Sequence, residues 1–125
     1  MPARYFSVTE ANEILTEVKP LMAELLERRA KVVRSRQDVA PILGDLTSNM
    51  GSHEATVIAH DFAVIEELIQ RIQAYGCQVK DMNVGLLDFL SQRNGREVYL
   101  CWRYGEEQIE YYHELHSGYN SRRHL

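Results

Sequence analysis

Apolar residues recur at helical spacing through the first half of the chain. Steps of three and four residues place five of them on one helix face, namely Ala11, Ile14, Val18, Leu21 and Leu25. Ser7 and Glu10 stand before this stripe at the spacing of a capping box, in which each side chain accepts from the backbone amide of the other residue. The pattern predicts a helix that begins at Ser7 and ends at Pro41 and Gly44.

A second helical stripe follows between His53 and Tyr75, with Gly76 as its C-terminal cap. Its members are Ala55, Ile58, Phe62, Ile65, Ile69 and Ile72. Residues 44–52 between the stripes have no periodicity and are rich in turn formers, which predicts a loop. We therefore expect an antiparallel helical hairpin over residues 7–75 whose seam is core. The alternative is that part of the seam is a dimer interface, because a small sheet leaves much helix surface uncovered.

After Gly76 the pattern changes to alternation, which indicates strands over 86–92, 97–103 and 107–113, with a further short strand at Val79. Asn94-Gly95 is typical of a two-residue type I′ hairpin turn. This turn places Phe89 opposite Leu100 and Leu87 opposite Trp102.

Gly105-Glu106 suits a type II′ turn, which places Trp102 opposite Ile109 and Val98 opposite His113. The two registers agree on one apolar sheet face made of Leu87, Phe89, Val98, Leu100, Trp102, Ile109, Tyr111 and His113. On the opposite face they place Tyr99 beside Tyr112. The predicted fold is α+β: a long antiparallel helical hairpin (7–75) packed against a small three- to four-stranded antiparallel sheet and C-terminal tail (77–125), in one domain over residues 1–125.

Composition narrows the class of protein. Hydrophobic residues make up 45% of the chain and charged residues 26%, as in ordinary globular domains. The net charge of −4 argues against nucleic-acid binding, although basic residues gather between Arg28 and Arg36. No stretch approaches the roughly 20 apolar residues of a membrane span. Two cysteines without a CxxC motif and no signal peptide favour free thiols in the cytoplasm.

His113 is the residue with the most chemical interest. As a structural residue it is a partly buried histidine satisfied by one hydrogen bond, and this interpretation is preferred. As a functional residue it is an imidazole near Glu114 or a helix carboxylate that transfers protons or binds a metal ion. With His116 it frames the run HELH, a weak metal motif, with Asp88 or Glu114 as further ligands.

Cys101 is a poor nucleophile in this register. It lies in a cross-strand row between Asp88 and Glu110, and negative charge on both sides raises the pKa of a thiol. No nucleophile with a base, phosphate-binding glycine loop or dinucleotide fingerprint accompanies it.

The segments FSVTEANEIL, VKDMNVGLLDF, NGREVYLCWRYGEE and YYHELHSGYNSR together resemble a bacterial family catalogued as domain of unknown function 2203. The resemblance covers nearly the whole chain and implies no particular reaction. The family pattern directs attention to Asp88, Arg96, Trp102, Arg103, Glu106, His113, Gly118 and Arg122. The chain departs from that pattern at Leu90, where the family often has proline, and at Ser121, where it often has glycine.

Two functions remain open. The favoured one is a non-enzymatic module without a cofactor, a homodimer that binds a protein or a small molecule. Its site residues are Asp88, Trp102, Arg103, Glu106, His113, Glu114 and Arg122. The alternative is a small metal-binding protein or metal-dependent enzyme that holds a divalent ion through His113, His116 and nearby carboxylates.

Overall fold

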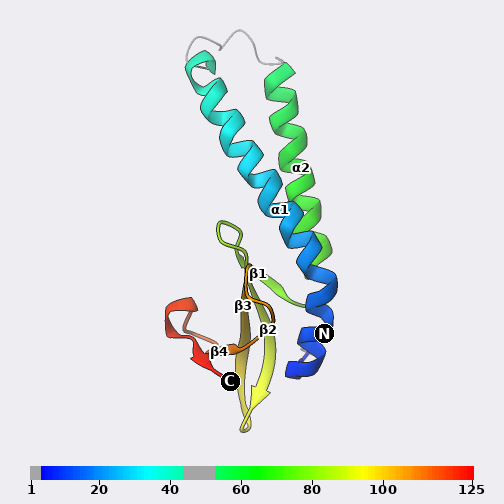
Figure 1. The fold of residues 1–125 in the computed structure, drawn as a ribbon, viewed down its shortest axis with the longest axis vertical. Helices are drawn as coiled ribbons and strands as arrows, with labels where there is room; N and C mark the ends of the chain where they lie inside the picture. The colour runs from blue at the N-terminus through cyan, green and yellow to red at the C-terminus, as the bar shows by residue number, and fades with distance from the viewer. Residues whose placement is uncertain (1–3, 44–52) are drawn as a thin grey trace.

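The computed structural model describes residues 4–43 and 53–125, and for 35–43 and 54 it describes the backbone alone. Two helices, α1 (Val8–Leu43) and α2 (His53–Gln73), form a long hairpin, and a sheet lies beside the end of the hairpin that holds the N-terminus (Figure 1). One hydrophobic core joins both helices to the sheet. The α+β fold with a helical hairpin is therefore confirmed, while the predicted loop over 44–52 lies outside the described residues.

The start of α1 is fixed by its cap and by the sheet. The amide of Glu10 donates to Ser7 Oγ at 3.0 Å, and the amide of Ser7 donates to Glu10 Oε1 at 3.1 Å, which confirms the capping box. Just before it, the amide of Phe6 donates to the carbonyl of Leu90 at 2.8 Å, and the Phe6 ring packs edge-on against Phe89. These contacts tie the first turn of the helix to the sheet.

The seam of α1 is close to the predicted one. Ala11, Val18 and Leu25 are buried as expected, and the sheet side of the helix also buries Leu15 and Met22. No described helix combines the length and apolarity that crossing a membrane requires.

The seam of α2 differs from the prediction. Ile65 and Ile72 are buried as expected, but Phe62 is 49% exposed, and its neighbour Asp61 is fully buried in the hairpin. The reason is an ion pair across the hairpin, since Asp61 Oδ1 lies 3.0 Å from Arg28 Nη1 and 3.6 Å from Lys31 Nζ. Two long cations on α1 turn the acidic position of α2 inward, which periodicity alone does not reveal.

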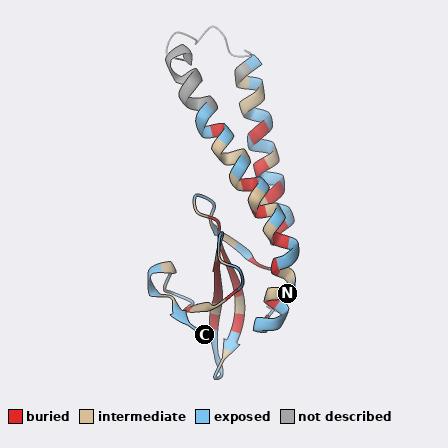
Figure 2. Ribbon diagram, viewed as in Figure 1, coloured by how far each residue is buried: buried red, intermediate tan, exposed pale blue. Residues whose placement is uncertain are grey.

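The sheet has five strands in sequence order, with each neighbouring pair antiparallel. The strands are β1 (Gln78–Asp81), β2 (Leu86–Arg93), β3 (Arg96–Arg103), β4 (Tyr111–Glu114) and β5 (Arg123–His124), with a short 3-10 turn η1 (Tyr119–Ser121) before β5. Buried residues follow the central strands and the facing sides of the helices (Figure 2). The sheet thus exceeds the predicted size through the pairing of the tail as β5.

The first hairpin register is confirmed. Phe89 pairs with Leu100 and Leu87 with Trp102 across β2 and β3. Asn94 and Gly95 have φ values of 54° and 78°, and a type I′ turn requires positive values at both positions.

The second register is wrong by one residue. β4 pairs Tyr99 with His113 and Leu100 with Tyr112, instead of Val98 with His113. The amide of Glu106 donates to the carbonyl of Arg103, and the chain then leaves the sheet until β4 begins at Tyr111. A long connection therefore replaces the predicted two-residue turn.

A shift of one residue exchanges the two faces of β4. His113 lies on the face opposite Trp102, and Tyr112 packs against the core and is not beside Tyr99 on the other face. The expected apolar face that included His113 and Tyr111 and the expected pair of tyrosines are therefore both corrected.

Candidate functional site

The corrected register gathers three potential metal ligands on one sheet face. Asp88 of β2 pairs directly with Cys101 of β3, and His113 of β4 pairs with Tyr99, two positions along β3 from Cys101. Side chains two residues apart on a strand share a face, so all three lie together. Their ligating atoms are within 4.8 Å of one another, and all three residues are buried.

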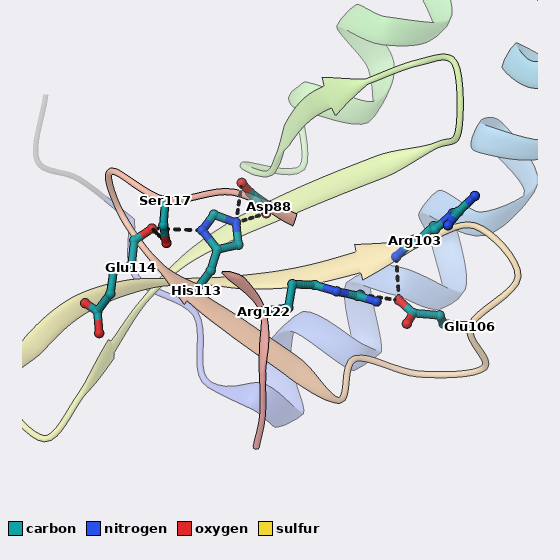
Figure 3. A network of polar contacts seen from close by, with 7 residues as sticks. All are labelled: Asp88, Arg103, Glu106, His113, Glu114, Ser117 and Arg122. Atoms are coloured by element: carbon teal, nitrogen blue, oxygen red, sulfur yellow. Dashed lines mark hydrogen bonds and ion pairs between the residues drawn. The ribbon is translucent and has the colours of Figure 1, made fainter. Parts of the chain in front are cut away.

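Hydrogen bonds fix the ring of His113 from both sides (Figure 3). Nδ1 lies 2.8 Å from the carbonyl oxygen of Glu114, and Nε2 lies 3.0 Å and 3.1 Å from the two carboxyl oxygens of Asp88. A carbonyl only accepts, so Nδ1 carries a hydrogen. The contact between Nε2 and Asp88 then needs one further proton, which the imidazole and the carboxyl group share.

The carbonyl that orients His113 is itself held in place. Ser117 donates to the Glu114 oxygen through both its amide and its hydroxyl, each at 3.1 Å. The carboxylate of Glu114 points away from the site, and its Oε1 lies 3.0 Å from Nη2 of Arg96. Glu114 thus contributes a backbone carbonyl to the site and not the predicted carboxylate.

Burial sets the protonation of the other two groups. It raises the pKa of Asp88, although His113 opposes the rise. Burial, followed by the nearby charge of Asp88, raises the pKa of Cys101 to about 12. The thiol of Cys101 therefore keeps its proton at neutral pH, and the hydrogen bond between Asp88 and His113 holds a second exchangeable proton.

This arrangement does not form a nucleophilic triad. In such a triad one imidazole nitrogen faces the nucleophile and the other faces an acid. Here Nε2 of His113 contacts Asp88 and Nδ1 contacts the Glu114 carbonyl, so neither nitrogen is available to Cys101. The predicted raised pKa of the Cys101 thiol is confirmed, but Tyr111 and not Glu110 stands opposite it.

A small cavity opens beside the three buried side chains. Its volume is about 100 Å³. Besides the three potential ligands it is lined by Lys80, Leu86, Leu115, Ser117, Gly118 and Tyr119. The segment after β4 therefore forms one wall of the cavity, and the sheet forms another.

A second polar cluster adjoins the first through Arg122 (Figure 3). Glu106 Oε1 accepts from Arg122 at 2.9 Å and from the backbone amide of Arg103 at 2.7 Å. The Arg122 guanidinium also lies over the rings of Tyr111 and Tyr119, 4.1 Å and 4.2 Å from their centroids. It lies near enough to Cys101 to oppose the rise of the thiol pKa.

The predicted site residues thus fall into separate groups. Asp88 and His113 are in contact, and Arg103, Glu106 and Arg122 converge beside them. Trp102 lies on the opposite face, where its indole N–H donates to the Glu106 carbonyl at 2.9 Å.

His116, the second histidine of the predicted metal pair, is exposed and is absent from the cluster of ligating atoms. It lines a neighbouring cavity of about 190 Å³ together with His113. The two histidines therefore do not share one set of ligating atoms in this structure.

Cys101 is the site residue that sequence reasoning missed as a ligand. The correct first register already placed it beside Asp88. His113 was missing from that face, because its position depends on the second turn. No motif in the sequence carries that information.

Comparison with known proteins gives one match. The model of a family described as an uncharacterised conserved protein (DUF2203) matches residues 4–125. No curated protein and no solved structure matches the chain.

Proposed function

The chain belongs to the DUF2203 family, and from its site we propose that it binds a divalent transition-metal ion of the zinc class through Asp88, Cys101 and His113. The observation that carries this proposal is the convergence of a carboxyl oxygen, a sulfur and an imidazole nitrogen within 4.8 Å on one buried sheet face. Thiolate, imidazole and carboxylate are the three ligand types that zinc takes in proteins.

The surroundings of His113 support the proposal. A histidine that binds a metal ion through one nitrogen almost always donates its other N–H to a carboxylate, a backbone carbonyl or water. The Nδ1–H of His113 has such a partner in the Glu114 carbonyl at 2.8 Å. Nε2 is then the ligating atom, and it already points at Asp88.

The spacing of the ligating atoms is close to that of a bound ion. Ligands of a tetrahedral zinc ion lie about 3.3–3.8 Å apart, given bond lengths of about 2.0–2.3 Å. The Asp88–His113 contact of 3.0 Å is shorter than this, and the whole set spans up to 4.8 Å. An ion that replaces the shared proton therefore requires a small outward turn of the Asp88 carboxylate and an approach of Cys101.

Metal titration tests the proposal. Protein purified without a histidine tag is titrated with Zn²⁺ in competition with a chromophoric chelator, and with Co²⁺ by absorption. We expect one ion per chain, and a band from sulfur-to-cobalt charge transfer in the Co²⁺ spectrum. Cys101→Ser should lose that band. In His113→Ala the Co²⁺ absorption typical of tetrahedral coordination should be much weaker than in the wild type.

His116→Ala is the matched control, because it removes a nearby exposed histidine from the same HELH run. Its affinity for Zn²⁺ should equal that of the wild type. Absence of binding by the wild type, or equal losses in the two histidine variants, would overturn the proposal.

The interaction module expected from the sequence stays a prediction, as does the homodimer. Tyr99 and Tyr112, which the sequence predicts side by side on one sheet face, lie on different faces and so do not form one binding surface. Exposed apolar side chains such as Phe62 on α2 still favour association.

A further inference from the structure

We infer that the metal ion keeps one coordination position open toward the 100 Å³ cavity, and that this position takes a small anion whose charge is matched by Lys80. This inference rests on the proposed metal site and names the ligand class of that site.

The ligand number leaves a position open. Zinc is usually four-coordinate, and sites with three protein ligands hold water or substrate in the fourth position. In the described part of the chain the cluster contains three groups of the ligating types. The hydroxyls of the cavity wall, on Ser117 and Tyr119, are neutral and are not of the thiolate, imidazole or carboxylate types that zinc takes.

The cavity limits the size of that ligand. It has about 100 Å³, and a cavity of about 150 Å³ is filled by benzene. A ligand here consists of about three to five non-hydrogen atoms. Azide, formate, bicarbonate and acetate have this size, whereas nucleotides and peptides do not.

The charges favour an anion. The two positive charges of the ion are balanced by the thiolate of Cys101 and the carboxylate of Asp88. Arg122 is paired with Glu106. Lys80 remains as a further positive charge on the cavity wall, and it lies near enough to Asp88 to act on it electrostatically. The site with its ion is thus net positive and attracts a negative ligand.

Lys80 is also held where it can act. Its ammonium lies over the ring of Tyr99, 4.8 Å from the centroid. Tyr99 is the strand partner of His113, so the cation is anchored beside the ligand row.

Azide titration of the Co²⁺-loaded protein tests this inference. At constant ionic strength, azide should change the cobalt absorption bands with saturation at one azide per ion. In protein saturated with Co²⁺, Lys80→Met should weaken azide binding about three- to tenfold, a range reduced because the lysine is solvent-exposed. Lys80→Arg keeps the charge and should retain most of the affinity.

The outcomes separate the two proposals. A protein that fails to bind Co²⁺ overturns the metal site and this inference together. A protein that binds Co²⁺ but whose spectrum does not respond to azide, or in which Lys80→Met binds azide as the wild type does, overturns the inference alone.

Discussion

Among the side chains that the structure describes, two aspartates are buried, one in the hairpin and one in the sheet, and they have different partners. Asp61 faces Arg28 and Lys31, whose side chains are 32% and 48% exposed. Asp88 faces His113 and Cys101, both buried. Each carboxyl group therefore has neighbours that offset its burial, but the chemistry of those neighbours is not the same.

The difference lies in which partners can give up a proton. Arginine stays protonated at any accessible pH, so the Asp61 pair is a fixed structural contact with no group that a metal ion could displace. Imidazole and thiol both lose a proton when a metal ion binds. A buried aspartate thus becomes a candidate site because of its partners, and burial alone does not make it one.

Exchange of each aspartate for asparagine gives the largest expected effect. Asp88→Asn removes an anionic ligand and should weaken Zn²⁺ binding by at least about 100-fold. Asp61→Asn alters the same residue type far from the cluster and should leave the Zn²⁺ affinity unchanged. Competition titration with a chelator measures both. Equal affinities for the two variants would contradict the distinction between the aspartates.

The pH dependence of metal binding sharpens the comparison. Burial raises the pKa of Cys101 to about 12, so the thiol proton competes with the ion throughout the neutral range. The affinity for Zn²⁺ should therefore rise with pH, by about tenfold per pH unit between about pH 6 and about pH 8, because the thiol proton leaves when the ion binds.

The number of protons displaced by Zn²⁺ can be measured directly as proton release in weak buffer. The wild type should release at least one proton per ion. Cys101→Ala has no thiol proton to lose and should release one proton fewer than the wild type. Release of no proton by the wild type would contradict the proposed protonation of the cluster.

The ion pair between Arg28 and Asp61 in the hairpin should affect the stability of the fold and not the binding of metal ions. Arg28→Met leaves the buried Asp61 with Lys31 alone and should lower the free energy of unfolding by about 2 kcal/mol, less than for a fully buried pair because Arg28 is partly exposed. Chemical denaturation measures the change.

The reverse substitution provides the control. In Asp61→Leu the two cations can turn to water, so we expect the free energy of unfolding to fall by less than about 1 kcal/mol. The double variant Arg28→Met/Asp61→Leu should recover most of the stability that Arg28→Met alone loses. If Asp61→Leu loses more stability than Arg28→Met, then the loss in Arg28→Met does not come from leaving the buried Asp61 carboxylate without its arginine partner.

A smaller effect on metal affinity is expected from Arg122. Its guanidinium lies between the rings of Tyr111 and Tyr119 beside the Cys101 sulfur, where its charge favours the thiolate. Arg122→Gln should weaken Zn²⁺ binding about tenfold, as expected for a residue that acts through a ligand. Arg93→Gln, which removes a cation stacked on Tyr112 in the same sheet, should leave the affinity unchanged.

Local signals explain which parts of the fold the sequence predicts. The capping box of Ser7 and Glu10 and the Asn94-Gly95 turn each depend on residues within a few positions of each other, and both are confirmed. The register between β2 and β3, and with it the pairing of Asp88 with Cys101, follows from that turn alone.

Long-range contacts explain where prediction fails. The chain after Gly105 is held by α1, since the amide of Ile109 donates to Asn12 Oδ1 at 2.8 Å and Lys19 donates to the Glu107 carbonyl. The orientation of α2 likewise depends on the pair between Asp61 and Arg28, 33 positions apart. Neither contact has a local pattern, so the face of His113 and the exposure of Phe62 could not be derived.

X-ray absorption spectroscopy of the zinc-loaded protein identifies the atoms that bind the ion. We expect one sulfur at about 2.3 Å and nitrogen and oxygen ligands at about 2.0–2.1 Å around each zinc ion. A zinc shell without sulfur, in protein whose Cys101 is intact and reduced, would contradict it.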